Sequence, residues 1–200
     1  DQFNVSRETY EVLDQYKSLV IDKNKEINLV GAKTIKNFEE RHIIDCAQAI
    51  DFIDLNEKIC TDIGSGAGLP GIVIAIVLKG QDIRFKMKLY EKSYHKSKFL
   101  KELVSKFKLD VDVIQKDIFL EKNLVSGSII ARAFKPLPII LELVEKNFRN
   151  YTNLIVYMGK NGKQLLEDSV KNWKFEYKEK RSITSENSFL INIKKIKRNE

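Results

Sequence analysis

The chain has 200 residues, 43% of them hydrophobic and 32% charged, which is typical of a globular domain and excludes a disordered chain. Its longest apolar run, 69–78, is shorter than the roughly 18 residues that a membrane span requires, and the first residues contain no signal-like apolar stretch. The two cysteines, Cys46 and Cys60, exclude a disulfide framework and a zinc site, whereas the net charge of +7 permits a polyanionic partner. We therefore expect a cytoplasmic protein with reduced thiols, no metal and no membrane partner.

The first 55 residues are predicted to be helical. Ser6 is a suitable N-cap, and apolar residues follow it at spacings of three and four, as on one face of a helix. These residues are Tyr10, Leu13, Tyr16 and Val20. A second helix is predicted over about 37–52, with Phe38, Ile43, Ala47 and Ile50 on one face. We expect residues 1–55 to form a helical extension packed on a core domain of residues 56–200.

From residue 56 onward, the pattern changes to strands that alternate with helices. The predicted strands are 58–63, 86–91, 111–115, 128–133, 154–158, 173–178 and 188–196. Helices are predicted over 70–78, after the N-cap Ser93, over 136–148 and over 163–170. Such alternation predicts an α/β fold: a mostly parallel seven-stranded sheet with helices on both faces. The last two strands are expected to pair antiparallel.

The most informative motif is the glycine-rich segment 62–71, which joins the first strand to its helix. Glycines let the backbone turn tightly and approach a ligand closely, and ligands of open parallel sheets bind at the carboxyl ends of the strands. The spacing Gly66-x-Gly68-x-x-Gly71 matches the dinucleotide fingerprint, in which a pyrophosphate rests on a helix N-terminus. A nicotinamide cofactor is therefore one candidate ligand.

Three acidic residues at the predicted strand ends favour a different ligand. Asp62, aimed into the loop, would repel a pyrophosphate but attract the cationic groups of S-adenosylmethionine. Glu91, at the end of the second strand, can hold a ribose hydroxyl in either cofactor. Asp117, just past the third strand, can accept a hydrogen bond from an adenine amino group. The pattern thus favours a methyl-donor site over a nicotinamide site.

Basic residues are concentrated between positions 84 and 108, a segment that contains nine Lys or Arg residues and only two Glu residues. Lys96, Lys98 and Lys101 lie on the predicted helix after the second strand and are candidates for phosphate contacts. The simpler interpretation of each lysine is a solvated helix face.

Further short motifs lie along the chain: Asn28-Leu29, Arg41-His42-Ile43-Ile44-Asp45, Lys96-Ser97-Lys98-Phe99-Leu100, Ala131-Arg132-Ala133-Phe134, and Lys160 after a strand. With the loop 62–71 and its Gly-Leu-Pro-Gly ending, they make the chain resemble the ribosomal RNA small-subunit methyltransferase G family (RsmG) over nearly its full length. The resemblance implies a Rossmann-like class I fold and an enzyme that transfers a methyl group from S-adenosylmethionine to N7 of one guanine in 16S rRNA. It implies 16S rRNA or the 30S particle as partner, and we expect a monomer.

The resemblance also assigns roles to individual positions. Gly64 and Leu69, with Gly66 and Gly68 in the same loop, would bind the methionine end of the donor, and Glu91 its ribose. Asp117 or Ile118 would contact the adenine. Arg132 matches an arginine of the cofactor pocket, although it could instead pair with a strand-end acid such as Glu91. Lys160 and His42 are candidates for RNA contact, and His42 could equally be a packed residue that joins the extension to the domain.

Guanine N7 carries a lone pair and no proton, so the reaction needs no general base. We therefore name no catalytic residue and expect the rate to come from alignment of the reactants, which can contribute ~7–11 kcal/mol. Three other functions stay open: a nicotinamide-dependent oxidoreductase, a non-catalytic RNA-binding protein, and a methyltransferase of a small molecule or a protein.

Overall fold

The computed structural model describes residues 5–199, which begin with α1 (Arg7–Lys23). Ser6 caps this helix by accepting a hydrogen bond from the Thr9 amide, as predicted. Leu13, Tyr16 and Val20 are buried, but Tyr10 lies on the solvent side and Thr9 takes the inward position. The prediction for Tyr10 was wrong by one residue, because the buried stripe begins at Thr9 and the Tyr10 hydroxyl donates to Glu39.

The helix predicted over 37–52 is divided into three short helices after α2 (Ala32–Ile35). They are the π-helix η1 (Glu39–Ile44), α3 (Asp45–Ala47) and the 3-10 helix η2 (Gln48–Phe52). The π-turn coincides with a tertiary hydrogen bond. The Asp45 amide donates to the carbonyls of Glu40 and His42, which leaves the Arg41 carbonyl to accept from Arg132 Nη2 at 2.8 Å. A tertiary contact has thus replaced one α-helical hydrogen bond.

The seven-stranded sheet has the order β3-β2-β1-β5-β7-β9-β8. The strands are β1 (Ile59–Ile63), β2 (Lys86–Tyr90), β3 (Val111–Ile114), β5 (Ser128–Ala131), β7 (Asn153–Met158), β8 (Trp173–Arg181) and β9 (Phe189–Arg198). The first five are parallel, whereas β9 pairs antiparallel with both β7 and β8, which confirms the predicted sheet. A second, two-stranded sheet of β4 (Leu124–Val125) and β6 (Phe148–Asn150) was not predicted, since segments this short carry little pattern.

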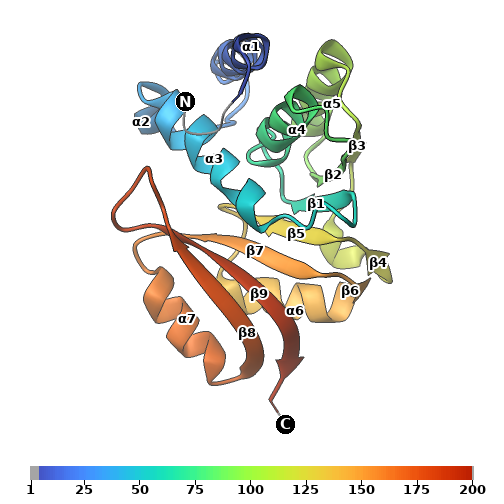
Figure 1. The fold of residues 1–200 in the computed structure, drawn as a ribbon, viewed down its shortest axis with the longest axis vertical. Helices are drawn as coiled ribbons and strands as arrows, with labels where there is room; N and C mark the ends of the chain where they lie inside the picture. The colour runs from blue at the N-terminus through green and yellow to red at the C-terminus, as the bar shows by residue number, and fades with distance from the viewer. Residues whose placement is uncertain (1–4, 200) are drawn as a thin grey trace.

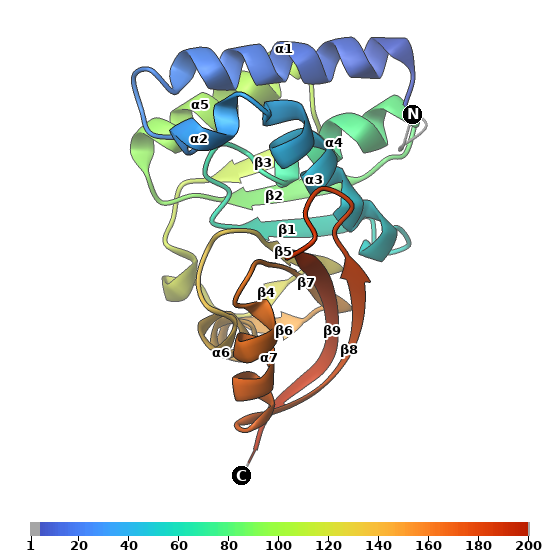
Figure 2. The same cartoon turned by 90° about the vertical axis from the view of Figure 1, so that its left-hand side faces the viewer.

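Helices cover both faces of the sheet. They are α4 (Gly71–Gly80), α5 (Tyr94–Phe107), η3 (Ile118–Leu120), α6 (Leu137–Asn147) and α7 (Gly162–Val170). The helices α1, α4 and α5 lie on one side, and α6 and α7 lie on the other (Figures 1 and 2). Each group buries its apolar face in a hydrophobic cluster with the strands. Within residues 5–199, no helix combines the length and apolar character that crossing a membrane demands.

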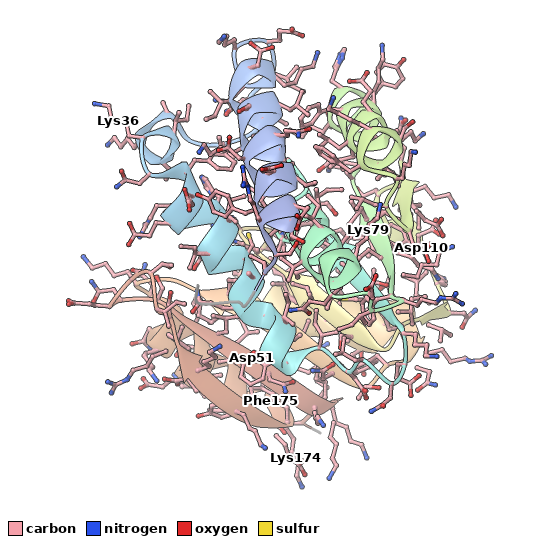
Figure 3. All side chains as sticks on the ribbon, turned by 45° about the horizontal axis from the view of Figure 1, so that its top comes forward. Lys36, Asp51, Lys79, Asp110, Lys174 and Phe175 are labelled. Atoms are coloured by element: carbon pink, nitrogen blue, oxygen red, sulfur yellow. The ribbon has the colours of Figure 1, made fainter. Side chains whose placement is uncertain are left out.

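Two lysines link elements that are distant in sequence. Lys79, labelled in Figure 3, donates from the end of α4 to the carbonyls of Phe107 and Lys108 at the end of α5. Lys180 of β8 pairs with Asp51 of η2, also labelled there, and so links the N-terminal helices to the last hairpin. The sheet order reverses between β1 and β5, so the carboxyl ends of these strands frame a crevice of the kind in which open α/β sheets bind ligands.

Candidate functional site

A cleft of about 420 Å³ lies at this carboxyl edge of the sheet. Its lining includes residues from the glycine loop, from the ends of β2, β3 and β5, and from the segment 29–31. Nine of the residues to which the sequence analysis gave a binding role line the cleft: His42, Gly64, Gly66, Leu69, Glu91, Lys96, Asp117, Ile118 and Arg132. The fold therefore brings the predicted strand-end acids and the glycine loop together.

The glycines of the loop have different tasks. Gly64, Gly66 and Gly68 all adopt positive φ angles, of 75°, 55° and 93°, which L side chains rarely accept. A Cβ atom on Gly66 would find no atom closer than 4.0 Å, so this residue leaves its space to the cleft. A Cβ on Gly68 would collide with Ile72 and Leu100, and Gly68 does not line the cleft. Gly68 thus serves close packing between the loop and the helices.

Glu91 fixes the loop to the start of α5. Its Oε2 accepts a hydrogen bond from the Gly66 amide at 2.9 Å, and its Oε1 accepts one from the Ser93 amide at 2.8 Å. A carboxylate has about four acceptor positions, so Glu91 keeps capacity for a ligand hydroxyl.

Asp62 lies beneath the loop and is only 1% exposed. Its Oδ2 accepts from the Gly71 amide at 3.0 Å, whereas its Oδ1 is the one fully buried side-chain polar atom within residues 5–199 that lacks a partner. Burial raises the pKa of this carboxyl to about 7, against the opposing effect of the Gly71 hydrogen bond. A buried acid with one unpaired oxygen fits a cationic ligand group, because a nearby positive charge would favour its ionised form.

The end of β3 forms the far wall of the cleft. Asp117 Oδ1 accepts from the Phe119 amide at 3.2 Å, and its Oδ2 lies 3.5 Å from Lys92 Nζ. Ile118 is buried and also lines the cleft. Both candidates for the adenine contact are therefore adjacent at this wall, one polar and one apolar.

Arg132, at the end of β5, is held by the N-terminal helices. Its Nε donates to Asp45 Oδ2 at 3.1 Å, and its Nη2 donates to the Arg41 carbonyl and, at 3.3 Å, to His42 Nδ1. The sequence left open an ion pair between Arg132 and a strand-end acid such as Glu91. The structure corrects the partner to Asp45, which the sequence could not reveal because the two residues are 87 positions apart.

His42 is a buried, neutral member of this network. Thr34 Oγ1 donates to the Gly31 carbonyl, so its oxygen accepts from His42 Nε2–H at 2.8 Å, and His42 Nδ1 is then free to accept from Arg132. Burial, and then the nearby Arg132, lower the His42 pKa to about 4. The residue links α2 to the core and also borders the cleft.

The basic candidates lie at different distances from the cleft. Lys96 lines it, whereas Lys98 and Lys101 lie further along α5 and are exposed. These three lysines form no ion pair with any residue in the described range 5–199. Lys160 follows β7 and borders a separate hollow rather than the cleft.

Several residues of the site had no role assigned from the sequence. Phe119 and Phe134 stack with ring centroids 5.8 Å apart, and both line the cleft. Leu29 and Val30 form another wall, because Asn24 Oδ1 accepts hydrogen bonds from both of their amides. Phe134, Leu29 and Asn28 belong to the motifs quoted above. The sequence therefore marked these residues but did not indicate what each of them does.

Two further observations bear on what the site can hold. The Tyr16 hydroxyl donates to the Ala67 carbonyl at 3.1 Å, so α1 contacts the glycine loop directly. Across residues 5–199, no cluster of three or more His, Cys, Asp or Glu side chains is placed to bind a metal ion, and both cysteines are buried and free.

Comparison with solved structures gives the same fold. A SAM-dependent methyltransferase from Aquifex aeolicus aligns with a TM-score of 0.58 at 14% identity, over 78% of this chain and 92% of that one. The 16S rRNA methylase RmtB aligns with a TM-score of 0.54 at 13% identity, over 98% of this chain and 76% of that one. At these identities the likeness establishes the Rossmann-like class I methyltransferase fold, which confirms the predicted fold class.

Comparison of sequences identifies the family. A relative from Pelagibacter ubique (strain HTCC1062), named ribosomal RNA small subunit methyltransferase G, is 54% identical over 98% of this chain and 92% of its own length. A relative of the same name from Bartonella tribocorum (strain CIP 105476 / IBS 506) is 34% identical over 97% of this chain and 91% of its own length. The family model described as rRNA small subunit methyltransferase G matches residues 9–191. The chain therefore belongs to the rRNA small subunit methyltransferase G family, as its motifs predicted.

Proposed function

We propose that this protein transfers a methyl group from S-adenosylmethionine to N7 of a guanine in the 16S rRNA of the small ribosomal subunit. The observation that carries the proposal is the buried Asp62 with its unpaired oxygen beneath an open glycine loop, in a chain 54% identical to a methyltransferase of that name. The protein would act as a monomer in the cytoplasm, on 16S rRNA or the 30S particle. Residues 1–55 would be a helical extension that supports the donor site.

The cleft offers a distinct group to each part of the donor. When bound, S-adenosylmethionine supplies a methyl group activated by a positively charged sulfur. Asp62, together with the backbone of Gly64, Gly66 and Leu69, would hold the cationic methionine end. Glu91 would accept from the ribose, and Asp117 or Ile118 would contact the adenine.

The chemistry of the acceptor means that none of the acidic residues in the cleft has to act as a general base. Guanine N7 has no proton to remove, and the histidine nearest the cleft, His42, is already committed to Thr34 and Arg132. The residues of the site need only hold donor and acceptor in line and exclude water, which can contribute ~7–11 kcal/mol.

Two alternatives are less compatible with the site. In a dinucleotide site the pyrophosphate uses free amides at the helix N-terminus. Here Asp62 Oδ2 occupies the Gly71 amide at the start of α4, so an anion would meet a carboxylate at that point. A non-catalytic RNA-binding protein would have no need of the open space at Gly66 or of the unpaired Asp62 oxygen.

Calorimetric titration with S-adenosylhomocysteine and, separately, NADH tests the cofactor class. We expect S-adenosylhomocysteine to bind and NADH not to bind. The second step is methyl transfer to 30S particles from cells that lack the modification, with the modified nucleotide mapped. Binding of NADH alone, or labelling of a site other than guanine N7 in 16S rRNA, would contradict the proposal.

Guanine N7 faces the deep major groove of paired RNA, so the target guanine must be unpaired or flipped into the site. Lys96, Lys98, Lys101 and Lys160 are the proposed phosphate contacts, with Lys96 nearest the cleft. Lys96→Glu should weaken RNA binding and lower the slope of log affinity against log salt by about one. Lys174→Glu on β8 is the matched control, and equal slopes for both variants would show that Lys96 meets no phosphate.

A further inference from the structure

A second cavity, of about 440 Å³, adjoins the cleft on the other side of the turn at Arg132. Gly31, His42, Arg132 and Ala133 line both spaces, so the two spaces border one another at these residues. The remaining lining comes from α2, η1 and α3, from the end of β7, and from the start of β9 together with the loop between β8 and β9, which reaches back to α3 (Figure 2). This volume lies within the range of roughly 300–1,000 Å³ that is usual for small-molecule sites.

The cleft and the second cavity lie side by side along the carboxyl edge of the sheet. The cleft lies over the ends of β3, β2 and β1 and extends to the segment that follows β5, and the second cavity lies over the ends of β5 and β7. A group at the β5 side of the cleft would therefore lie beside a group in the second cavity, next to Arg132 and Ala133. This is the relation that a methyl donor and its acceptor require.

The lining of the second cavity suits a flat heterocycle with a polar rim. Met158, Phe189 and Leu190 supply an apolar floor. Ser188 Oγ donates to Ser185 Oγ at 3.1 Å, which leaves the Ser185 hydroxyl proton available to a ligand. Hydroxyls and apolar side chains together are the usual lining of a pocket for one base.

Arg132 supplies a donor that distinguishes guanine from adenine. Its Nε and Nη2 are used by Asp45, the Arg41 carbonyl and His42, whereas its Nη1 hydrogen-bonds to no group within residues 5–199. Guanine carries an acceptor, O6, directly beside N7, and adenine carries an amino donor at the same position. An Nη1–H donor therefore fits guanine and clashes electrostatically with adenine, and a single bond to O6 leaves the N7 lone pair free.

We infer that this second cavity holds the target guanine and that Arg132 Nη1 donates to its O6, an inference that rests on the proposed methyl transfer. Arg132 would then read the acceptor base rather than bind only the donor. The ion pair with Asp45 and the bond to His42 would fix the orientation of the guanidinium before the base arrives.

Gly159→Leu tests the cavity. Gly159 lines it, a Cβ there would meet no atom within 4 Å, and the residue is not in the left-handed region, so leucine can fill the space without displacing the backbone. We expect methyl transfer to unmodified 30S particles to fall at least 100-fold, while the Kd for S-adenosylhomocysteine changes less than twofold. Ser188→Phe is a second variant that should block the cavity. Asn187→Phe, at the exposed neighbouring position, is the matched control and should keep wild-type transfer. Melting temperatures verify that each protein is folded.

Arg132→Lys tests the donor to O6, since lysine keeps the charge near Asp45 but not the planar fork. Transfer should fall at least tenfold with a smaller than threefold change in the Kd for S-adenosylhomocysteine. Wild-type transfer by both Gly159→Leu and Ser188→Phe, or an equal loss of donor affinity and transfer, would overturn the inference and leave the proposed function standing. Absence of transfer by the wild-type protein, in contrast, would refute the proposed function itself, and the inference with it.

Discussion

The two halves of the sheet edge are built by different means. Around the glycine loop, carboxylates accept hydrogen bonds from main-chain amides, namely Gly71 to Asp62 and both Gly66 and Ser93 to Glu91. Around Arg132, side chains bind one another across long stretches of sequence: Asp45 accepts from Arg132, 87 positions away, and from Thr184, 139 positions away. The half around the glycine loop (the glycine-loop half) is held by hydrogen bonds between main-chain amides and two carboxylates. The half around Arg132 (the Arg132 half) is held by contacts between particular side chains, so each of those side chains matters.

This difference separates the expected effects of substitution. A change in the glycine-loop half should affect ligand binding with a modest effect on stability, because the loop exposes its amides and an open space to the cleft. A change in the Arg132 half should affect the free energy of unfolding, because it leaves a buried charge without its partner. The cleft and the second cavity meet at the boundary between the glycine-loop half and the Arg132 half.

The largest effect is expected from Asp45→Ala. Asp45 and Arg132 are only 17% and 16% exposed, and removal of one partner from such a pair costs about 3–5 kcal/mol. Asp51→Ala is the matched control, because its pair with Lys180 is exposed at the Asp51 side and should contribute about 0–1 kcal/mol. Denaturant unfolding of both variants checks the prediction. Equal losses in the free energy of unfolding would show that the buried pair of Asp45 and Arg132 stabilises the fold no more than the exposed pair does.

Next in size is Gly66→Val, which fills the space that the loop leaves to the cleft. We expect S-adenosylhomocysteine affinity to fall at least 100-fold, because the branched side chain extends from a Cβ position that now meets no protein atom within 4.0 Å. The positive φ of Gly66 adds a modest cost in stability. Gly159→Ala, on the Arg132 half, should retain donor affinity in the same calorimetric titration. Undiminished binding by Gly66→Val would mean that the loop does not contact the donor.

If Asp62 holds the cationic end of the donor, as proposed, donor binding should depend on pH. With its pKa raised to about 7 by burial, the free protein holds Asp62 largely protonated at pH 6 and largely ionised at pH 8. The ionised fraction rises about tenfold over that interval, so affinity for the ammonium group of S-adenosylhomocysteine should rise by about the same factor. The folded pKa lies above the ordinary value, so Asp62 contributes stability at acidic pH that is lost as pH rises to about 7. Asp62→Asn should flatten the binding profile; an unchanged slope would place the titration on another group.

The fold and the glycine-loop half were predictable because their signals are local. The loop 62–71, the strand-end acid Glu91 and the caps Ser6 and Ser93 are each specified within a few residues of sequence. The N-terminal helix was placed correctly even though Tyr10 was assigned to the wrong face, since periodicity fixes a helix more firmly than its rotation.

The Arg132 half was not predictable, for the opposite reason. No local pattern pairs Arg132 with Asp45, or places the Ile183 amide against Gln48 Oε1 across 135 positions. In η1 the Arg41 carbonyl accepts from Arg132 instead of the Asp45 amide, a contact that the sequence of the helix alone does not indicate, so that sequence predicts an ordinary α-helix. Long-range side-chain contacts also define the second cavity: some of its residues belong to motifs visible in the sequence, but no local pattern places them around one space.

The smallest effect is expected where α1 touches the glycine loop. Tyr16→Phe removes only the hydroxyl that donates to the Ala67 carbonyl, and one such buried hydrogen bond contributes about 0.5–1.5 kcal/mol. If α1 holds the loop in its binding conformation, this loss should appear as a severalfold weaker affinity for S-adenosylhomocysteine as well as a lower melting temperature. Tyr10→Phe, on the same helix with an exposed hydroxyl, should change neither quantity. A fall in melting temperature without a change in donor affinity would mean that α1 stabilises the domain while the Glu91 contacts alone set the shape of the loop.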